Sequence, residues 1–139
     1  MSKPWSLDPQ LSRDTAPVGD LALSRVLAVN DADYPWLILV PRRAGAVEIA
    51  DLDPADAARL MEEIALVSRA LREVTRCDKL NVAAIGNIVP QLHVHIVARR
   101  KDDPLWPKPV WGHAPMRAGE TEGFGRFIAD IRDRLKIAD

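Results

Sequence analysis

The chain has 139 residues, of which 47% are hydrophobic and 28% charged, the composition of an ordinary globular protein. We expect a single domain over residues 1–139, because this length can enclose one hydrophobic core. The formal net charge of −1 argues against a nucleic-acid-binding surface, and the one cysteine, Cys77, excludes an internal disulfide. The N-terminus lacks the apolar run of a signal peptide, and no segment approaches the roughly 20 apolar residues of a membrane span. These features predict a cytoplasmic protein without nucleic-acid or membrane partners.

The N-terminal stretch is mixed in character. Asp8 and Pro9 are a favourable cap and first residue for a short helix within residues 7–13. Pro17 and Gly19 follow, and we expect them to break the chain before the first strand.

Two apolar runs then predict a pair of strands. Residues 24–29 and 36–40 are short and apolar, and their content of β-branched and aromatic side chains favours strands over helices. The second run opens at Trp36 and is closed by Pro41. The short polar turn between the two runs predicts an antiparallel hairpin.

The period of the hydrophobic pattern changes at Asp53, which with Pro54 forms a favourable helix start. Apolar residues then recur at spacings of four and three, which predicts an amphipathic helix over about residues 54–75. The apolar stripe consists of Leu60, Ile64, Val67, Leu71 and Val74. We expect Arg59 and Glu63, four residues apart, to form an ion pair on the solvated face of this helix.

The second half of the chain continues the sheet. Residues 80–85 predict a third strand, and a tight Gly/Pro connection leads from it into a further strand over residues 91–99. The four prolines within residues 101–120 exclude a helix or an interior strand, and we expect this segment to wrap over a surface, anchored by its tryptophans. Apolar residues at helical spacing predict a C-terminal helix over about residues 123–137. Together these patterns predict an α+β domain built on an antiparallel sheet of about five strands.

The strand over residues 91–99 carries the most unusual side chains. It alternates strictly, so its apolar residues face a core while Gln91, His93 and His95 share the other face. Two of the chain's three histidines therefore lie about 6–7 Å apart along the strand. Both could contact a single phosphate group or metal ion.

Four interpretations of this polar face compete. It is a solvated strand face, a metal site, an acid–base site for a small substrate, or a nucleophilic site that acts on phosphorus. A metal ion such as zinc would need a third or fourth ligand. The remaining histidine, His113, lies 18 residues beyond His95 in the proline-rich segment.

Residues 91–97, Gln-Leu-His-Val-His-Ile-Val, resemble the signature of the histidine-triad (HIT) superfamily, His-φ-His-φ-His-φ-φ, in which φ is apolar. Six of the seven positions agree, and Gln91 stands in place of the first histidine. Residues 27–31 resemble the family's strand that ends in an acidic residue, and residues 37–43 resemble its apolar strand closed by proline and basic residues. The resemblance covers about residues 24–112, the motif-bearing core.

The resemblance implies a role for each matching residue. His93 matches the nucleophile that attacks the α-phosphorus of a nucleotide and forms a nucleotidyl-imidazole intermediate. His95 matches the residue that donates a hydrogen bond to a phosphate oxygen, and Gln91 completes the catalytic set. Asp31 matches the ribose ligand. The other residues assigned to nucleotide binding are Asn30, Asn87 and Trp106.

The implied function is that of a homodimeric hydrolase or nucleotidyl transferase without a cofactor. Its substrate would be a nucleoside phosphate derivative, such as a dinucleoside polyphosphate or a phosphoramidate. Gln91 cannot carry a proton at neutral pH, and Trp36 stands where many members of the family have a histidine. A nucleotide-binding protein with little or no turnover is the second interpretation, and a zinc-dependent protein is the third.

Overall fold

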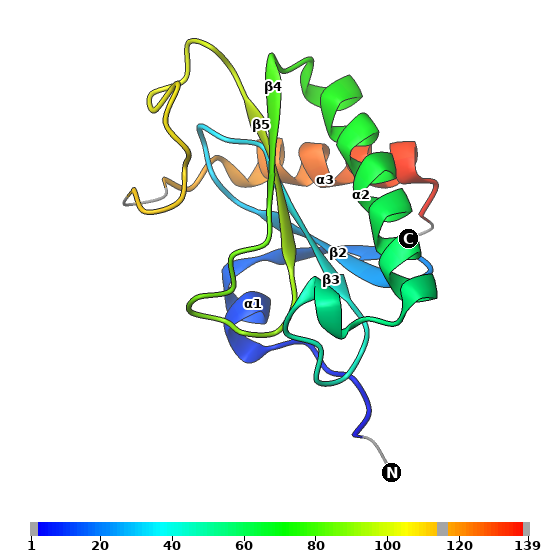
Figure 1. Ribbon diagram of the computed structural model, residues 1–139. Helices are drawn as coiled ribbons and strands as arrows, with labels where there is room; N and C mark the ends of the chain where they lie inside the picture. The colour runs from blue at the N-terminus through cyan, green and yellow to red at the C-terminus, as the bar shows by residue number, and fades with distance from the viewer. Residues whose placement is uncertain (1–2, 114–116, 138–139) are drawn as a thin grey trace.

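The structure, a computed structural model, describes residues 3–113 and 117–137. Within these residues the chain forms one five-stranded antiparallel sheet in the order β1-β2-β3-β5-β4, three α-helices and a short 3-10 helix (Figure 1). In chain order the elements are α1 (Pro9–Asp14), β1 (Ala16–Asp20), β2 (Ser24–Val29), β3 (Trp36–Pro41), η1 (Ile49–Asp51), α2 (Pro54–Thr75), β4 (Lys79–Ala83), β5 (Val94–Arg99) and α3 (Thr121–Leu135). The predicted fold class, an α+β domain on an antiparallel sheet of about five strands, is confirmed.

The predicted central hairpin is present. β2 and β3 pair antiparallel, with Leu27 opposite Ile38 and Val29 opposite Trp36. All six residues of β3 are buried, because layers of side chains cover both faces of the sheet. β3 therefore lies at the centre of the molecule and contributes to both cores.

β1 shows that the predicted chain break at Pro17 and Gly19 is wrong. Both residues lie within β1, and the pairing register with β2 shifts between them. β1 is an edge strand, where a proline and a bulge are tolerated because one side of the strand makes no ladder hydrogen bonds. Gly19 is required there, since a Cβ at this position would collide with the side chain of Ile137.

The helices α2 and α3 cover one face of the sheet (Figure 1). Buried side chains from β1, β2, β3 and β5 pack against both helices in the main core, which includes Leu37, Leu39, Leu71, Ile96 and Ile131. The bounds predicted for α2 are confirmed, and its start is fixed locally. The Asp53 carboxylate accepts a hydrogen bond from the Asp56 N–H at 2.8 Å.

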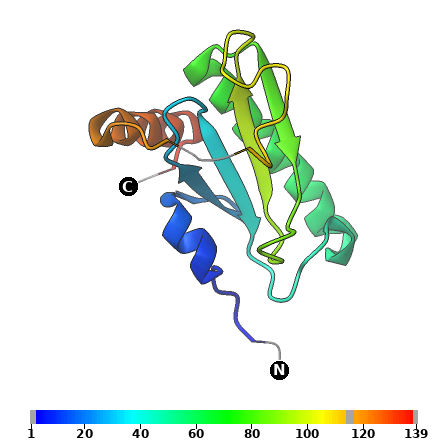
Figure 2. The same ribbon diagram turned by 90° about the vertical axis from the view of Figure 1, so that its left-hand side faces the viewer.

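A second core covers the opposite face, where α1 and the loop of residues 101–113 lie (Figure 2). Side chains from β2, β3 and β5 on this face contact Leu11 of α1 and Val110 of the loop. Trp111 packs against the same cluster, in line with the expected anchoring of the proline-rich segment. The histidine face of β5 therefore points into this second layer and away from bulk solvent.

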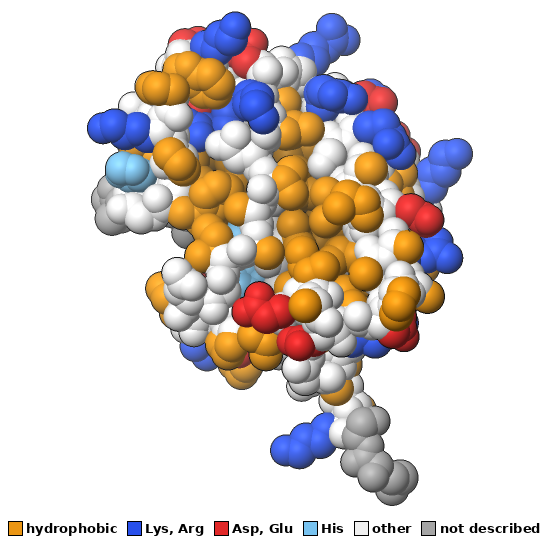
Figure 3. All heavy atoms as spheres, in the orientation of Figure 1, with side chains coloured by type: hydrophobic (Ala, Val, Ile, Leu, Met, Phe, Trp, Pro, Cys, Tyr) orange, Lys and Arg blue, Asp and Glu red, His pale blue; other side chains and the backbone are white. Residues whose placement is uncertain are grey.

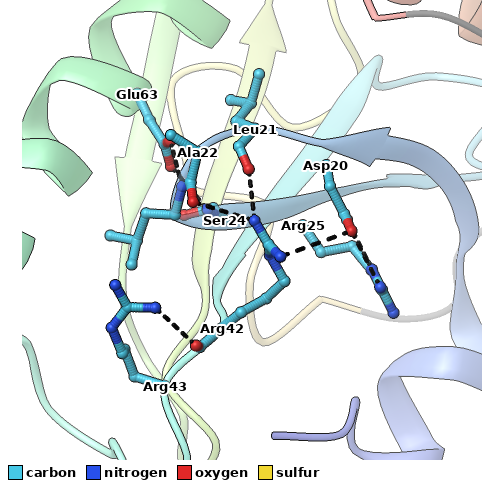
Figure 4. A network of polar contacts seen from close by, with 9 residues as sticks. Asp20, Leu21, Ala22, Ser24, Arg25, Arg42, Arg43 and Glu63 are labelled. Carbon is cyan, nitrogen blue, oxygen red and sulfur yellow. Dashed lines mark hydrogen bonds and ion pairs between the residues drawn. The ribbon is translucent and has the colours of Figure 1, made fainter.

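The predicted ion pair between Arg59 and Glu63 is wrong. Glu63 is only 4% exposed, and its carboxylate accepts hydrogen bonds from the backbone N–H groups of Leu23 and Ser24 at 2.8 and 2.9 Å (Figure 4). Arg59 lies near Glu62 instead, at 3.4 Å. Helical spacing places Glu63 near the apolar stripe, and the start of β2 offers it two donors that lie 39 and 40 residues away in sequence.

Several element ends differ from their predicted positions. β5 begins at Val94 rather than Gln91, because the Leu92 N–H donates to the Ala46 carbonyl at 3.0 Å and not to a neighbouring strand. β4 ends at Ala83 rather than Ile85. Within the described residues, no helix is long and apolar enough to cross a membrane.

Candidate active site

A cavity of about 560 Å³ opens on the second face of the sheet, and both motif histidines line it. This volume lies within the range of small-molecule sites. Figure 3 shows pale-blue histidine atoms inside a hollow of the surface. The walls come from α1, β2, β3, the loop after β4 and the loop of residues 101–113. The lining side chains include Leu11, Asp14, Trp36, Ile38, Asn87, His93, His95 and Trp111.

The two histidines lie side by side on the floor of the cavity. His95 is on β5, opposite Ile38 of β3, and His93 precedes the first residue of β5. Their ring centroids are 4.9 Å apart. The two imidazoles therefore lie together, as the alternation of the motif predicts, and this separation is short enough for both to reach one small group.

His93 is 7% exposed, and its ring is oriented by the backbone. Its Nδ1 lies 2.7 Å from the carbonyl oxygen of Gln91. A carbonyl can only accept a hydrogen bond, so Nδ1 carries the proton of the neutral ring. The lone pair is therefore on Nε2, and a nucleophilic imidazole needs such an unprotonated ring nitrogen.

His95 has the opposite arrangement of its ring nitrogens. The indole Nε1–H of Trp36 donates to Nδ1 of His95 at 3.1 Å. An indole can only donate, so the proton of His95 is on Nε2. Burial, and to a smaller extent the neighbouring His93, lower the pKa of His95 to about 4. His95 is thus a neutral N–H donor near pH 7.

The side chain of Gln91 is not among the residues that line the cavity. Its Oε1 accepts from the Asp8 N–H, and its Nε2 donates to the Ser6 carbonyl, both at 2.9 Å. Asp8 is also the N-cap of α1, whose residues form one wall of the cavity. Gln91 therefore attaches this wall to the segment that carries His93.

The structure brings only some of the predicted nucleotide-binding residues to the histidines. Asn87 lines the same cavity. Asp31 lines an adjoining cavity of about 370 Å³, which shares Trp36 and Trp111 with the first. The Oδ1 atom of Asp31 accepts from two backbone N–H groups of the following turn, at 2.8 and 3.2 Å.

Asn30 and Trp106 lie outside the linings of both cavities. The side-chain Oδ1 of Asn30 accepts a hydrogen bond from the Gly119 N–H at 3.0 Å. The ring of Trp106 lies beside the guanidinium group of Arg99, 5.6 Å from the ring centroid. Arg99 is 1% exposed and forms a bidentate pair with Asp103, at 2.7 and 3.0 Å.

The contacts that Trp36 and Trp111 make at the histidine site could not be predicted from the sequence pattern. Trp36 opens a strand whose apolar pattern predicts a core residue, and it is buried as that pattern implies. Trp111 meets the ring of His95 edge to face at 5.5 Å and that of Trp36 at 6.1 Å. Its partners lie on β3 and β5, so only the folded chain brings them together. The local sequence pattern likewise does not predict that α1 forms one wall of the cavity.

The charge around the histidines is low. Among the described residues that line the histidine cavity, Asp14 is the one acidic or basic side chain other than the histidines, and it accepts from Gln10 Nε2 at 2.8 Å. No group of three or more His, Cys, Asp or Glu residues in the described part of the chain could hold a metal ion. A further hollow, of about 610 Å³, lies between β1 and the end of α3, and neither motif histidine lines it.

The geometry agrees with comparisons to known proteins. A family model described as HIT domain matches residues 11–102. The fold is similar to a histidine triad protein from Bradyrhizobium japonicum, with 56% identity, a TM-score of 0.93, and 96% of this chain and 99% of that chain covered. It is also similar to one from Sinorhizobium meliloti 1021, with 45% identity, a TM-score of 0.90 and coverage of 94% and 96%. No curated protein matches the sequence.

A third solved structure extends this similarity. It is a histidine triad protein from Marinobacter aquaeolei VT8, with 40% identity and a TM-score of 0.92. The alignment covers 96% of this chain and 98% of that one. All three similarities extend beyond the family model's range, into the N-terminal segment or the C-terminal helix.

Proposed function

This chain belongs to the HIT domain family, and on that premise we propose that it is a nucleotide-binding hydrolase or nucleotidyl transferase. It would act at the α-phosphate of a nucleoside phosphate derivative, through a nucleotidyl-histidine intermediate on His93. The observation that carries this proposal is the 2.7 Å contact between His93 Nδ1 and the Gln91 carbonyl. This contact leaves Nε2 unprotonated on the floor of a cavity that is large enough for a nucleotide.

The proposed chemistry follows from the two tautomers. Nε2 of His93 attacks phosphorus, the leaving group departs with the electrons of its bond, and the ring becomes a phosphorylated imidazolium. The Gln91 carbonyl stabilises that charge through the Nδ1–H. His95 Nε2–H donates to a phosphoryl oxygen, where negative charge develops. Water or another acceptor then attacks phosphorus, and the P–N electrons return to Nε2.

The binding roles are proposals of the same kind. Asn87 is proposed to contact phosphate, supported by its position in the lining of the histidine cavity. Asp31 is proposed to accept from ribose hydroxyls, supported by its position in the adjoining cavity. We assign Asn30 and Trp106 to support of these walls, through Gly119 and Arg99, rather than to ligand contact. Gln91 is proposed to act through the α1 wall.

One observation favours the second candidate, a nucleotide-binding protein with little turnover. Gln91 has no titratable proton, and both ends of its amide are engaged by Ser6 and Asp8. An acid for the leaving group is therefore missing at the position where the family signature has a histidine. Turnover measurements on a nucleotide substrate separate the two candidates.

A trapping experiment tests the first candidate. The protein would be mixed with the nitrophenyl ester of AMP, quenched within milliseconds and digested, and the peptides would be examined by mass spectrometry. We expect one adenylyl group on the peptide that carries His93, and none in His93→Ala. Release of nitrophenol without any labelled peptide across all quench times would contradict the covalent intermediate.

We further propose a symmetric dimer located in the cytoplasm. The unpaired edge of β4 and the neighbouring face of α2 expose apolar side chains, among them Val82 at 47% and Met61 at 64%. Figure 3 shows apolar side chains gathered over the middle of one face of the molecule. Such an edge and patch support a two-fold contact between identical chains. The single cysteine supports a reducing compartment.

A further inference from the structure

We propose that this site consumes nucleotide derivatives whose leaving group departs as a stable anion, and that Trp36 is the positioning residue that sets this preference. Phosphoanhydrides and aryl esters belong to this class, whereas alkyl esters and amidates of basic amines do not. The inference rests on the proposed function and narrows its substrate class. It is carried by two hydrogen-bond arrangements, those of Gln91 and His95.

In the first arrangement, the side chain of Gln91 is not available to protonate the leaving group. Gln91 Oε1 and Nε2 are both taken by the N-terminal segment, at 2.9 Å each. The amide could supply only a hydrogen bond even if it turned, because it has no titratable proton. A proton for a basic leaving group must therefore come from elsewhere.

In the second arrangement, His95 is kept from taking up the second ring proton that it would need to act as an acid. A histidine acts as an acid when both ring nitrogens carry hydrogen, so Nδ1 would have to be protonated. The Trp36 indole N–H points at that nitrogen from 3.1 Å, and a protonated Nδ1 would face this donor with no lone pair. Trp36 is 7% exposed, so neither water nor another acceptor readily replaces it. Burial, and to a smaller extent the neighbouring His93, also disfavour a protonated His95, because both lower its pKa.

The other titratable groups around His95 do not replace it. His93 has its Nδ1–H on the Gln91 carbonyl, and its Nε2 becomes bonded to phosphorus. Asp14 on α1 lines the same cavity, and its carboxylate accepts a hydrogen bond from Gln10 Nε2 at 2.8 Å. His113 lines the adjoining cavity. Arg99, further along the same face of β5, is paired with Asp103 at 2.7 and 3.0 Å.

The balance of the reaction then selects the leaving group. The Nε2–P bond forms as the P–O bond breaks, and the oxygen leaves with both electrons and no proton. A phosphate or phenolate anion is stable in this form, whereas an alkoxide or an amide anion is not. In the hydrolytic half-reaction water supplies the oxygen, and its proton passes to solvent. The products are a nucleoside monophosphate and the free leaving-group anion.

A series of AMP derivatives with graded leaving groups tests the substrate class on the unaltered protein. It would contain nitrophenyl and phenyl esters, the methyl ester and the n-butylamidate, with kcat/KM measured at pH 7. We expect the methyl ester and butylamidate to be slower than the nitrophenyl ester by 10²-fold or more, since an acid catalyst contributes roughly 10²–10⁴-fold. Equal kcat/KM across the series would overturn the inference, yet it would leave covalent catalysis by His93 standing. If His93→Ala matched the parent on every compound, the proposed function itself would fail.

Nitrogen NMR of the histidine rings tests the role of Trp36 without any substrate. In the parent we expect His95 to show the Nε2–H tautomer from pH 5.5 to pH 8. In Trp36→Phe, which keeps an aromatic ring but removes the N–H, we expect both tautomers and earlier protonation as pH falls. An unchanged His95 spectrum in Trp36→Phe would overturn the positioning role. Trp5→Phe is the matched control, because Trp5 packs against the same core without a hydrogen bond to a histidine.

Discussion

Nδ1 of His93 lies 2.7 Å from the carbonyl oxygen of Gln91, two residues earlier in the chain. The nucleophile is therefore oriented by the backbone at position 91, whereas the side chain at the same position binds Ser6 and Asp8. Gln91 thus orients His93 on the floor of the cavity with its backbone carbonyl and holds the α1 wall with its side chain. Substitution at position 91 can change the α1 wall while the tautomer of His93 is kept.

The first prediction concerns the nucleophile. His93→Ala should abolish turnover of a nucleotide substrate, because Nε2 is the atom proposed to bond to phosphorus. AMP binding should persist, since the other contacts of the cavity remain. Turnover assays and calorimetry with AMP measure the two properties, and thermal melts show whether the variant is folded. Parental turnover by a folded His93→Ala protein would exclude covalent catalysis at this position.

The second prediction concerns the Gln91 side chain. Gln91→Ala leaves the Asp8 N–H and the Ser6 carbonyl without their partner, so we expect the free energy of unfolding to fall by about 1–3 kcal/mol. KM should also rise, because α1 forms one wall of the cavity. Gln91→Glu is the matched control: it can still accept from Asp8 but cannot donate to Ser6. An intermediate loss is expected for Gln91→Glu in urea unfolding, and equal stability of all three proteins would contradict the prediction.

The third prediction separates two roles of Asp31. If its carboxylate binds ribose, Asp31→Ala should weaken AMP binding by about 1.5–3 kcal/mol, the usual contribution of a hydrogen bond to a charged group. Asp31→Asn should keep the turn, since its Oδ1 can still accept from Asp33 and Tyr34. Calorimetry measures the affinity for AMP, and a thermal melt measures the stability that the turn contributes. Unchanged AMP affinity in both variants would remove Asp31 from the nucleotide site.

The fourth prediction is a pH dependence of stability. The pKa of His95 is about 4 in the folded chain, against an ordinary value of 6.5. Between these values the unfolded chain binds a proton that the folded chain does not, so the free energy of unfolding falls as pH falls from 6.5 to 4. A shift of this size corresponds to roughly 3 kcal/mol.

Substitution isolates this contribution from those of the carboxylates. His95→Gln should lose less stability between pH 7 and pH 4 than the parent does, as measured by urea unfolding. His113→Gln removes an exposed histidine and is the control, which should behave as the parent. The same loss of stability in His95→Gln and the parent would show that His95 titrates normally in the folded chain.

The fifth prediction concerns assembly. Sedimentation at micromolar concentration should give twice the chain mass of 15.4 kDa. Val82→Asp should shift the mass to that of one chain, because a buried, unpaired charge is costly at an apolar contact. Val47→Asp is the control, since Val47 is 45% exposed, close to the 47% of Val82, but lies outside β4 and α2. A parental mass near 15 kDa would contradict the dimer.

Local chemistry explains which parts of the fold are predictable from the sequence. The cap at Asp53 and the apolar stripe after it lie within one stretch of chain, and α2 has the predicted bounds. The hairpin of β2 and β3 is also local, since a short turn joins two apolar runs. The edge strand β1 is missed because its tolerance of Pro17 depends on having a partner on one side only.

The site is less predictable, because its decisive contacts join distant residues. The sequence places His93 and His95 on one face, and the structure confirms this. The bond from Trp36 to His95 spans 59 positions, and those of Gln91 span 83 and 85. Periodicity says nothing about partners at such separations. Glu63 shows the same limit, since its two backbone partners at the start of β2 lie 39 and 40 residues away in sequence.

The link between Gln91 and the N-terminal segment has a consequence for synthesis of the chain. Asp8 leaves the ribosome 83 residues before the side chain that holds it. Until then Leu11 of α1 and the preceding Trp5 and Leu7 have no sheet to cover, because β3 and β5 complete that face later. A nascent chain would therefore expose these three apolar side chains for most of its elongation, and exposed apolar surface favours aggregation. The active site would be among the last parts of the molecule to form, even though one of its walls is made first.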